Sequence, residues 1–179
     1  DLLSTIDPAW AAPGASGTED RTVRNLGRLF SASKFAGIAV AISLTAEGFI
    51  RSGFLPELQQ YIEDESTIIC SPHKRYSPLP RVNDIGLQLR RQRVGQVLLA
   101  GFIANLRLES HLRDLLEQGF EVAVVRDAIA GPKLPDGDGY LSALINFRRV
   151  ANALWTTEQA VKALGAGYLS RLNARESPK

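Results

Sequence analysis

The clearest hydrophobic pattern in the chain spans residues 96–119. An apolar run at residues 97–100 predicts a strand buried on both faces. We expect Gly101 to break this strand and Asn105 to cap the helix that follows. Leucines then recur at helical spacing and form one apolar stripe, made of Leu108, Leu112, Leu115 and Leu116. This stretch therefore predicts a strand, a sharp turn and an amphipathic helix.

The next residues complete a strand–helix–strand unit. Gly119 is suited to end the helix, and residues 121–125 are again apolar enough to predict a strand. Ligands of open parallel sheets bind at the carboxyl ends of the strands. The turn at residues 101–107 is therefore the first place where chemistry is expected.

Strands alternate with helices along the rest of the chain. Further strands are predicted at residues 2–6, 38–42, 67–70 and 153–155. Further helices are predicted from Thr18 or Asp20 to Gly37, and at residues 55–62, 83–93, 140–152 and 158–164. Residues 8–17 and 131–139 read as loops, and the polar tail from Asn173 is expected to fray. The pattern predicts a single domain over residues 1–179, with a mainly parallel sheet in a three-layer α/β arrangement.

The charge balance argues against a nucleic-acid partner. The net charge is +2 and the basic residues are scattered, with Arg90, Arg91 and Arg93 as the tightest group. A nucleic-acid surface would be expected to carry a basic stripe with aromatic side chains for stacking. No apolar run reaches the length of about 18 residues that a membrane span needs. We therefore expect neither nucleic acid nor a membrane among the partners.

Cysteine and histidine are too few for a metal centre or a disulfide framework. Cys70 is the single cysteine, and His73 and His111 are the two histidines. A lone cysteine inside an apolar strand is typical of a small buried hydrophobe. The sequence shows no secretory signal and contains no methionine. We expect a cytoplasmic protein with neither metal nor cofactor.

Three candidate groups fall at successive strand ends. Asp7 follows the first predicted strand, Lys74 follows the third, and the turn at residues 101–107 follows the fourth. A carboxylate can move protons, an ammonium can hold it ionised, and turn amides can stabilise developing negative charge. Acyl transfer or hydrolysis is the chemistry this set favours. The alternative is a structural ion pair between Asp7 and Lys74, because such pairs also perturb pKa values.

Several motifs resemble the isochorismatase-like (cysteine hydrolase) superfamily. They are Pro72-His-Lys74-x-Tyr76-x-Pro78, Asn83-Asp-x-x-Leu-Gln-Leu-Arg90, Leu99-Ala-Gly101-x-x-Ala-Asn-Leu-x-x-Glu-Ser-His-Leu-Arg-Asp, Asn146-Phe-Arg and Ala151-Asn-Ala-x-Trp-Thr-Thr157. The resemblance runs over residues 18–164 and is densest over residues 71–157. It implies a three-layer α/β/α sandwich with a six-stranded, mainly parallel sheet, usually assembled into oligomers.

The same resemblance implies an active site with a catalytic Asp after the first strand, a Lys after the third and a nucleophilic Cys after the fourth. Asp7 and Lys74 match the first two positions, whereas Arg107 occupies the position of the Cys. The oxyanion turn falls on Phe102, Ile103 and Ala104, where the family often has a non-prolyl cis peptide, here between Phe102 and Ile103.

Three further residues are assigned to substrate binding, namely Tyr76, Asn105 and Asp127. Asp127 has a structural alternative, which is to fix the loop at the end of its strand.

Arg107 changes the expected chemistry. A guanidinium stays protonated, with a pKa above about 12, and cannot act as a nucleophile. The helix N-terminus also disfavours a cation by roughly 0.3–1 kcal/mol. Arg107 is therefore expected to have a counter-charge, either Asp7 or a bound anion.

Three functions remain open from the sequence. The first is a hydrolase of a small anionic metabolite without the thiol route, since relatives that hydrolyse the vinyl ether of isochorismate also lack the Cys. The second is a catalytically inactive pseudoenzyme that binds an anion or a partner protein. The third is an ordinary amidase-type cysteine hydrolase in a variant form. In each case the family resemblance implies a homodimer or a higher homo-oligomer.

Overall fold

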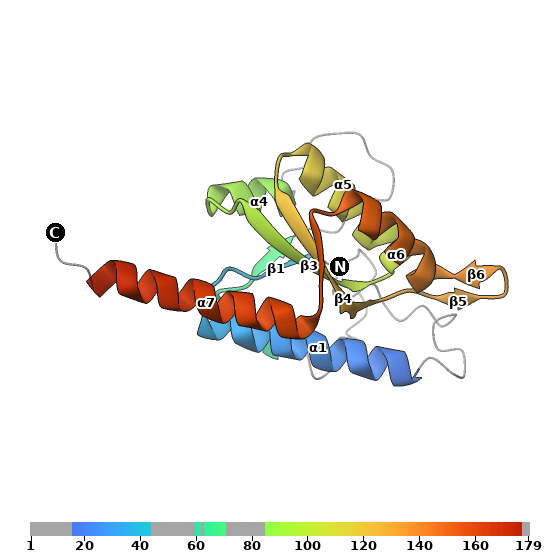
Figure 1. Ribbon diagram of the computed structural model, residues 1–179, viewed down its shortest axis with the longest axis horizontal. Coiled ribbons are helices and arrows are strands. Elements are labelled where there is room, and N and C mark those ends of the chain that lie inside the picture. Colours follow the sequence, from blue (N-terminus) through green and yellow to red (C-terminus); the bar gives the residue numbers. More distant parts are fainter. Residues whose placement is uncertain (1–15, 44–59, 62, 71–84, 177–179) are drawn as a thin grey trace.

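The computed structural model describes residues 16–43, 60–61, 63–70 and 85–176, and the fold is stated for these residues. Two long helices, α1 (Ser16–Phe35) and α7 (Thr157–Glu176), lie side by side on one face of the strands (Figure 1). The opposite face is covered by α4 (Ile85–Arg91), α5 (Glu109–Glu117) and α6 (Gly139–Val150). The predicted three-layer arrangement is therefore confirmed.

The five central strands form two parallel sheets. β3 (Gln96–Phe102), β4 (Glu121–Ala130) and β7 (Ala153–Trp155) make one sheet in the order β3-β4-β7. β1 (Ala41–Ser43) and β2 (Ile68–Cys70) make the other. This confirms the α/β class with a parallel sheet. The first predicted strand, at residues 2–6, lies outside the described residues.

Two hydrophobic clusters show that the strands are covered on both faces. Leu99 of β3 packs in the cluster with Leu112 of α5 and Phe147 of α6. Leu98 packs against the second cluster, which includes Phe30 of α1 and Ala160 of α7. Neighbouring residues of a strand point to opposite faces, so β3 is buried between two helical layers, as its apolar run predicted.

A wide bulge interrupts the pairing of β3 with β4. Leu99 pairs with Val124 and Gly101 pairs with Ile129, so β3 advances by two residues while β4 advances by five. The extra residues of β4 therefore lie at positions 125–128. Bulges re-aim side chains and are common beside active sites. Gly101, with φ 134°, continues β3 through this irregularity.

Several predicted boundaries are wrong. Gly101 does not break its strand, because β3 runs on to Phe102. β4 continues to Ala130, so Asp127 lies inside the strand and not at its end. The last helix extends to Glu176, through the positions where an end at Leu164 and a frayed tail were expected.

Other boundaries move less. α1 begins at Ser16, β1 begins at Ala41, and the loop predicted at residues 131–139 contains the hairpin of β5 (Lys133–Leu134) and β6 (Gly137–Asp138). Of the helix predicted at residues 55–62, the structure describes Gln60 and Tyr61, which are helical.

Candidate functional site

The candidate site begins with an unusual turn after β3. Ile103 has φ 56° and ψ 60°, which is the left-handed helical region. A β-branched side chain is disfavoured there, and such strained residues cluster at functional sites. The expected cis peptide between Phe102 and Ile103 is wrong, since the described residues contain no cis peptide bond. The chain changes direction through the left-handed Ile103 instead.

A short π-helix, η2 (Ala104–Leu108), follows this turn directly. The carbonyl of Ile103 accepts hydrogen bonds from three successive amides, those of Leu106 (3.2 Å), Arg107 (3.0 Å) and Leu108 (3.3 Å). π-Helices are rare, and their single turns are frequently found at functional sites. The earlier amides, on Ala104 and Asn105, belong to the first turn, whose N–H groups have no acceptor inside the helix. They are the groups that an anion at this turn would meet.

Asn105 does not cap the helix as expected. The residue at the N-cap position is Ile103, and the structure records no side-chain hydrogen bond at this cap. The Asn105 side chain turns inward, and its Oδ1 is buried with no hydrogen-bond donor among the described residues. Oδ1 lies so close to Gly139 that a Cβ there would be 2.8 Å away. Asn105 therefore packs under the base of the β5–β6 hairpin and fills space that only a glycine leaves open.

Arg107 lies on η2, between the exposed Leu106 and the fully buried Leu108, and is itself half-buried. It stands where the sequence resemblance implies a nucleophilic cysteine. Cys70, the single thiol of the sequence, is the last residue of β2 and is not on this turn. The described part of the site therefore offers a guanidinium, amides and an amide side chain, and no thiol.

Glu109, the first residue of α5, accepts hydrogen bonds from two side chains next to the turn, and the sequence analysis did not identify it. Its Oε1 accepts from Arg113 Nη2 at 2.8 Å, and its Oε2 accepts from Asn146 Nδ2 at 3.0 Å. The first bond lies within α5, and the second joins α5 to α6 immediately after η2. The i,i+4 spacing of Glu109 and Arg113 was a signal that could have identified the first contact. The contact with Asn146 depends on the tertiary fold.

Asp127 occupies the bulge of β4 and has a clear structural role. Its Oδ1 accepts from the backbone N of Thr157 at 2.7 Å and from the Thr157 hydroxyl at 2.9 Å. Its backbone O accepts from Asn25 Nδ2 at 2.7 Å. Asp127 thus joins the bulge to the start of α7 and to α1. These contacts agree with the predicted alternative that Asp127 fixes this part of the chain.

The structure brings Phe102, Ile103, Ala104, Asn105 and Arg107 together on one turn at the carboxyl end of β3. The other predicted site residues, namely Asp7, Lys74 and Tyr76, lie outside the described residues. Their roles stay predictions.

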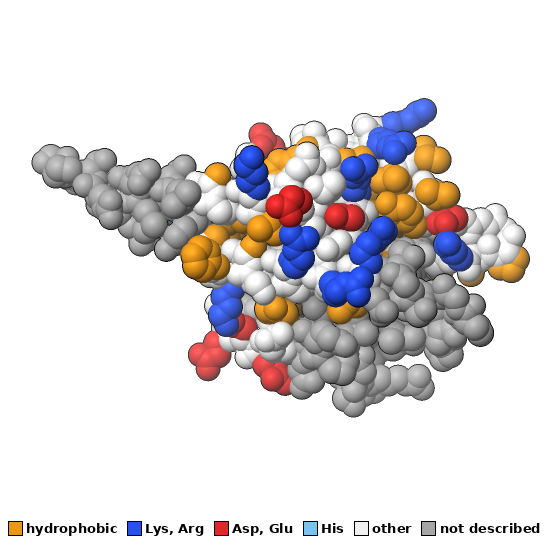
Figure 2. Space-filling view, turned by 60° about the horizontal axis from the view of Figure 1, so that its bottom comes forward, with side chains coloured by type: hydrophobic (Ala, Val, Ile, Leu, Met, Phe, Trp, Pro, Cys, Tyr) orange, Lys and Arg blue, Asp and Glu red, His pale blue; other side chains and the backbone are white. Residues whose placement is uncertain are grey.

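The described residues contain no group of three or more His, Cys, Asp or Glu side chains that could hold a metal ion. Within the same residues, no helix combines the length and apolar character of a membrane span. On the face drawn in Figure 2, Lys and Arg side chains are dispersed between apolar and neutral ones.

Comparison with known proteins adds a family and several related folds. Residues 6–159 match the family profile described as the isochorismatase domain. A search of curated proteins finds no match.

Three solved structures illustrate the fold similarity. A cysteine hydrolase from Pseudomonas syringae pv. phaseolicola 1448A is 16% identical, with a TM-score of 0.67 over 89% of each chain. MAR1 ribonuclease from Caenorhabditis elegans is 21% identical, with a TM-score of 0.65 over 81% of this chain and 70% of that chain. Pyrazinamidase/nicotinamidase from Streptococcus mutans UA159 is 16% identical, with a TM-score of 0.57 over 76% of this chain and 87% of that one. At these sequence identities the similarity shows a shared fold.

Proposed function

The chain belongs to the isochorismatase family, and on this premise we propose that it hydrolyses a small anionic substrate at the turn after β3, without a thiol nucleophile. The observation that carries the proposal is the position of Arg107, half-buried on η2 just after the left-handed Ile103. A permanently charged guanidinium at this place suits a carboxylate ligand better than a neutral amide.

Electrostatics at the turn support an anionic ligand. A cation near a helix N-terminus is disfavoured by roughly 0.3–1 kcal/mol, and an anion there is favoured by a similar amount. A carboxylate bound at this turn would lie between the Arg107 cation and the amides of Ala104 and Asn105.

The proposed reaction is acid-catalysed hydrolysis of an enol ether such as the enolpyruvyl group of isochorismate. Asp7, in its protonated form, would donate a proton to the terminal carbon of the vinyl group. Water would add to the resulting oxocarbenium carbon and return a proton to the Asp7 carboxylate, which leaves a hemiketal. The hemiketal C–O bond would then break as its hydroxyl proton passes to the leaving oxygen, releasing a keto acid and an alcohol. This route needs an acid and bound water rather than a nucleophilic side chain. Lys74, Arg107 and Tyr76 would hold the substrate's carboxylates and hydroxyl groups.

The test compares wild type with Asp7→Asn, Arg107→Ala and Arg107→Cys on isochorismate and on a panel of small amides. We expect wild type to hydrolyse isochorismate and Asp7→Asn to lose this activity. Arg107→Ala should raise KM at least tenfold, because it removes a charged contact to the substrate. Arg148→Ala is the matched control, since Arg148 is exposed on α6, and it should leave KM unchanged.

Three outcomes would contradict the proposal. Comparable amide hydrolysis by wild type and Arg107→Cys would show that the lost thiol does not matter and would favour an ordinary amidase. An unchanged KM in Arg107→Ala would show that Arg107 does not bind the anionic group of the substrate. Calorimetric binding of isochorismate without turnover would favour the pseudoenzyme, in which the fold is kept and the site only binds.

A further inference from the structure

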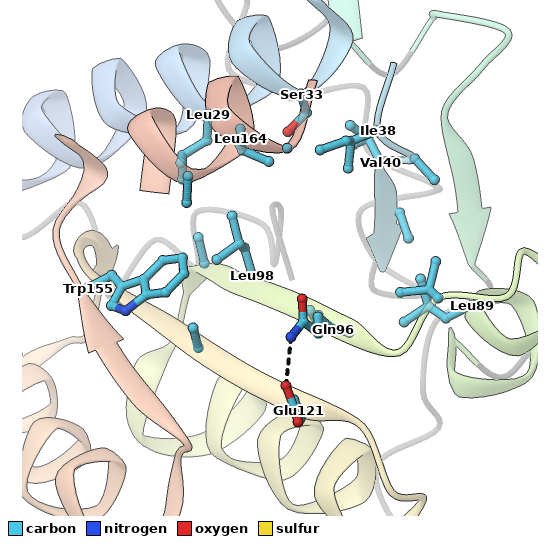
Figure 3. Close-up of a pocket in the computed structure, with 18 of the residues that line it drawn as sticks. Leu29, Ser33, Ile38, Val40, Leu89, Gln96, Leu98, Glu121, Trp155 and Leu164 are labelled. Atoms are coloured by element: carbon cyan, nitrogen blue, oxygen red, sulfur yellow. Dashed lines mark hydrogen bonds between the residues drawn. The ribbon is translucent and has the colours of Figure 1, made fainter. Parts of the chain in front are cut away.

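Helix α6 presents large apolar side chains to its surroundings, whereas α1 and α7 turn theirs inward. Leu29 of α1 and Leu164 of α7 point toward the strands and line the pocket drawn in Figure 3. Leu141 and Ile145 of α6 are instead 54% and 58% exposed. Because they are four residues apart, they lie on the same outer face of the helix. α6 therefore carries an apolar stripe on its outer side.

The inner face of α6 is apolar as well. Ala143 and Phe147 are fully buried and belong to the core cluster that includes residues of α5. They follow Leu141 and Ile145 by two residues, which is about 200° round a helix of 3.6 residues per turn. A helix that is apolar on opposite faces is expected to be buried on both. The inner face is covered by this chain, and the outer face has no such cover in the described structure.

Two further exposed leucines lie on elements that contact α6. They are Leu106 of η2 and Leu134 of β5, each about half exposed. With Leu141 and Ile145 they make up four of the six large apolar side chains that are exposed among the described residues. On the face drawn in Figure 2, apolar side chains gather beside the projecting β5–β6 hairpin. Contiguous exposed apolar side chains mark interaction surfaces.

The two ends of the α6 stripe differ in charge. Asp136 and Asp138 lie on the hairpin just before α6, where Lys133 is the one basic residue. Arg148 and Arg149 are exposed in the last turn of the helix. Neither arginine forms an ion pair with a residue that the structure describes. The apolar stripe thus runs from an acidic end to a basic end.

We propose that this surface is a self-association interface, in which α6 packs antiparallel against α6 of a second copy of the chain around a two-fold axis. Such a contact joins the same patch of both copies, so the patch must be complementary to itself. Antiparallel packing meets this condition. With Leu141 opposite Ile145 of the second copy, Asp138 is opposite Arg148 of the second copy, because each charged residue lies three positions beyond its apolar neighbour.

Other arrangements fit the surface less well. Parallel packing of two α6 helices would bring Arg148 and Arg149 against the same basic residues of the second copy, and like charges in contact repel. It would also align the two helix dipoles. A different partner protein would have to supply its own acidic group to match the arginines. A second copy already carries such a group at the required spacing.

Sedimentation velocity of the full-length chain tests the association. We expect wild type to form dimers that dissociate on dilution. Ile145→Asp should raise the dissociation constant by roughly tenfold or more, because it would bury a carboxylate in an apolar contact. Phe35→Asp is the matched control, since Phe35 is an exposed apolar residue at the end of α1, in the opposite helical layer. It should leave the dissociation constant unchanged.

Cysteine crosslinking tests the orientation. In a Cys70→Ser background, Leu141→Cys and Ile145→Cys are prepared separately, one of them isotopically labelled, and mixed before mild oxidation. Packed helix axes are about 8–10 Å apart, which allows the Cα separation of roughly 7 Å that a disulfide requires. We expect mixed disulfide dimers in excess over those of either variant alone, measured by mass spectrometry. Antiparallel packing would place the two copies of residue 141 about 6 Å apart along the helix axis, which disfavours their pairing.

Three outcomes would overturn the inference. A wild type that stays monomeric at high concentration would leave this surface to a different partner protein. A dimer that survives Ile145→Asp, with circular dichroism showing a native fold, would place the contact elsewhere on the chain. Disulfides of Leu141→Cys with itself in excess over the mixed ones would show parallel packing. Neither measurement uses activity, so the result is independent of the proposed hydrolysis.

Discussion

Asp127 and Thr157 are joined by two hydrogen bonds to a single carboxylate oxygen, from the Thr157 backbone N at 2.7 Å and the Thr157 hydroxyl at 2.9 Å. Thr157 is fully buried at the start of α7, so water cannot replace this acceptor. The pair connects the bulge of β4 to the helix that covers the sheet. The bulge of β4, which lies opposite Leu99–Gly101 of β3, is thereby fixed by a contact between residues thirty positions apart.

Replacing Asp127 with alanine should destabilise the fold. The Thr157 N–H and hydroxyl would lose a charged acceptor, which should lower the free energy of unfolding by about 1–3 kcal/mol in urea denaturation. Asp127→Asn keeps a carbonyl oxygen and should lose less. Asp136→Ala, at an exposed site in the β5–β6 turn, is the control and should stay within about 0.5 kcal/mol of wild type. Equal losses for Asp127→Ala and Asp136→Ala would contradict the assignment.

Gly139 should be far less tolerant of substitution than Gly137, although they are only two residues apart: Gly137 adjoins the turn of the β5–β6 hairpin, and Gly139 directly follows β6. A Cβ at Gly139 would be 2.8 Å from Asn105 Oδ1 and 2.9 Å from Pro132 Cδ, whereas a Cβ at Gly137 would meet nothing within 4 Å. Overpacking a tight site costs about 1–3 kcal/mol. We expect Gly139→Ala to lose stability in this range and Gly137→Ala to lose little, measured by chemical denaturation. Similar stability of the two variants would show that Asn105 moves aside freely.

The sequence predicted the elements that depend on local pattern. The strand at residues 153–155 is found with the predicted bounds, because an apolar triplet before Thr156 and Thr157 needs no tertiary information. Of the predicted stripe, Leu108, Leu112 and Leu115 are fully buried and Leu116 is partly buried. Binary patterning fixes which face of an element is buried, and this face is what the sequence encodes most directly.

The turn after β3 was predicted in position but not in form. Gly101 and Asn105 look like a strand break and a helix cap, yet the bulge of β4 lets β3 continue and the left-handed Ile103 starts η2. The continuation of β3 depends on its pairing with β4, and the propensity of isoleucine gives no sign of a left-handed backbone. The same limit applies to Glu109, whose contact with Asn146 spans 37 positions.

Asp64 should make stability depend on pH. The Lys34 side chain, followed by the Ser66 hydroxyl and amide, lowers the pKa of the Asp64 carboxyl well below its usual range. Its folded pKa is thus below its unfolded value near 4. The stabilisation is therefore complete above pH 4 to 5 and is lost as the pH falls toward the folded pKa.

The comparison of wild type with Asp64→Asn measures this contribution. We expect wild type to have the higher melting temperature at pH 7, and the difference should shrink below about pH 4 and in high salt. Glu65→Gln, at an exposed neighbouring position, is the control and should show no such trend. A difference that grows on acidification would contradict the role of Lys34 and Ser66.

The left-handed backbone of Ile103 should reverse the usual order of alanine and glycine. With φ 56° and ψ 60°, Ile103 occupies a conformation that costs an L-residue about 1–2 kcal/mol and costs glycine almost nothing. Ile103→Gly and Ile103→Ala both lose the packing of the isoleucine side chain, so their difference isolates the backbone term. We expect Ile103→Gly to be more stable than Ile103→Ala by about 1 kcal/mol in urea denaturation.

The exposed helical residue Ser142 of α6 provides the control. There, the same pair of substitutions should give the opposite order, with alanine favoured by about 1 kcal/mol. If alanine is the better residue at both positions, the turn after β3 is not strained, and the conformation of Ile103 cannot mark the functional site.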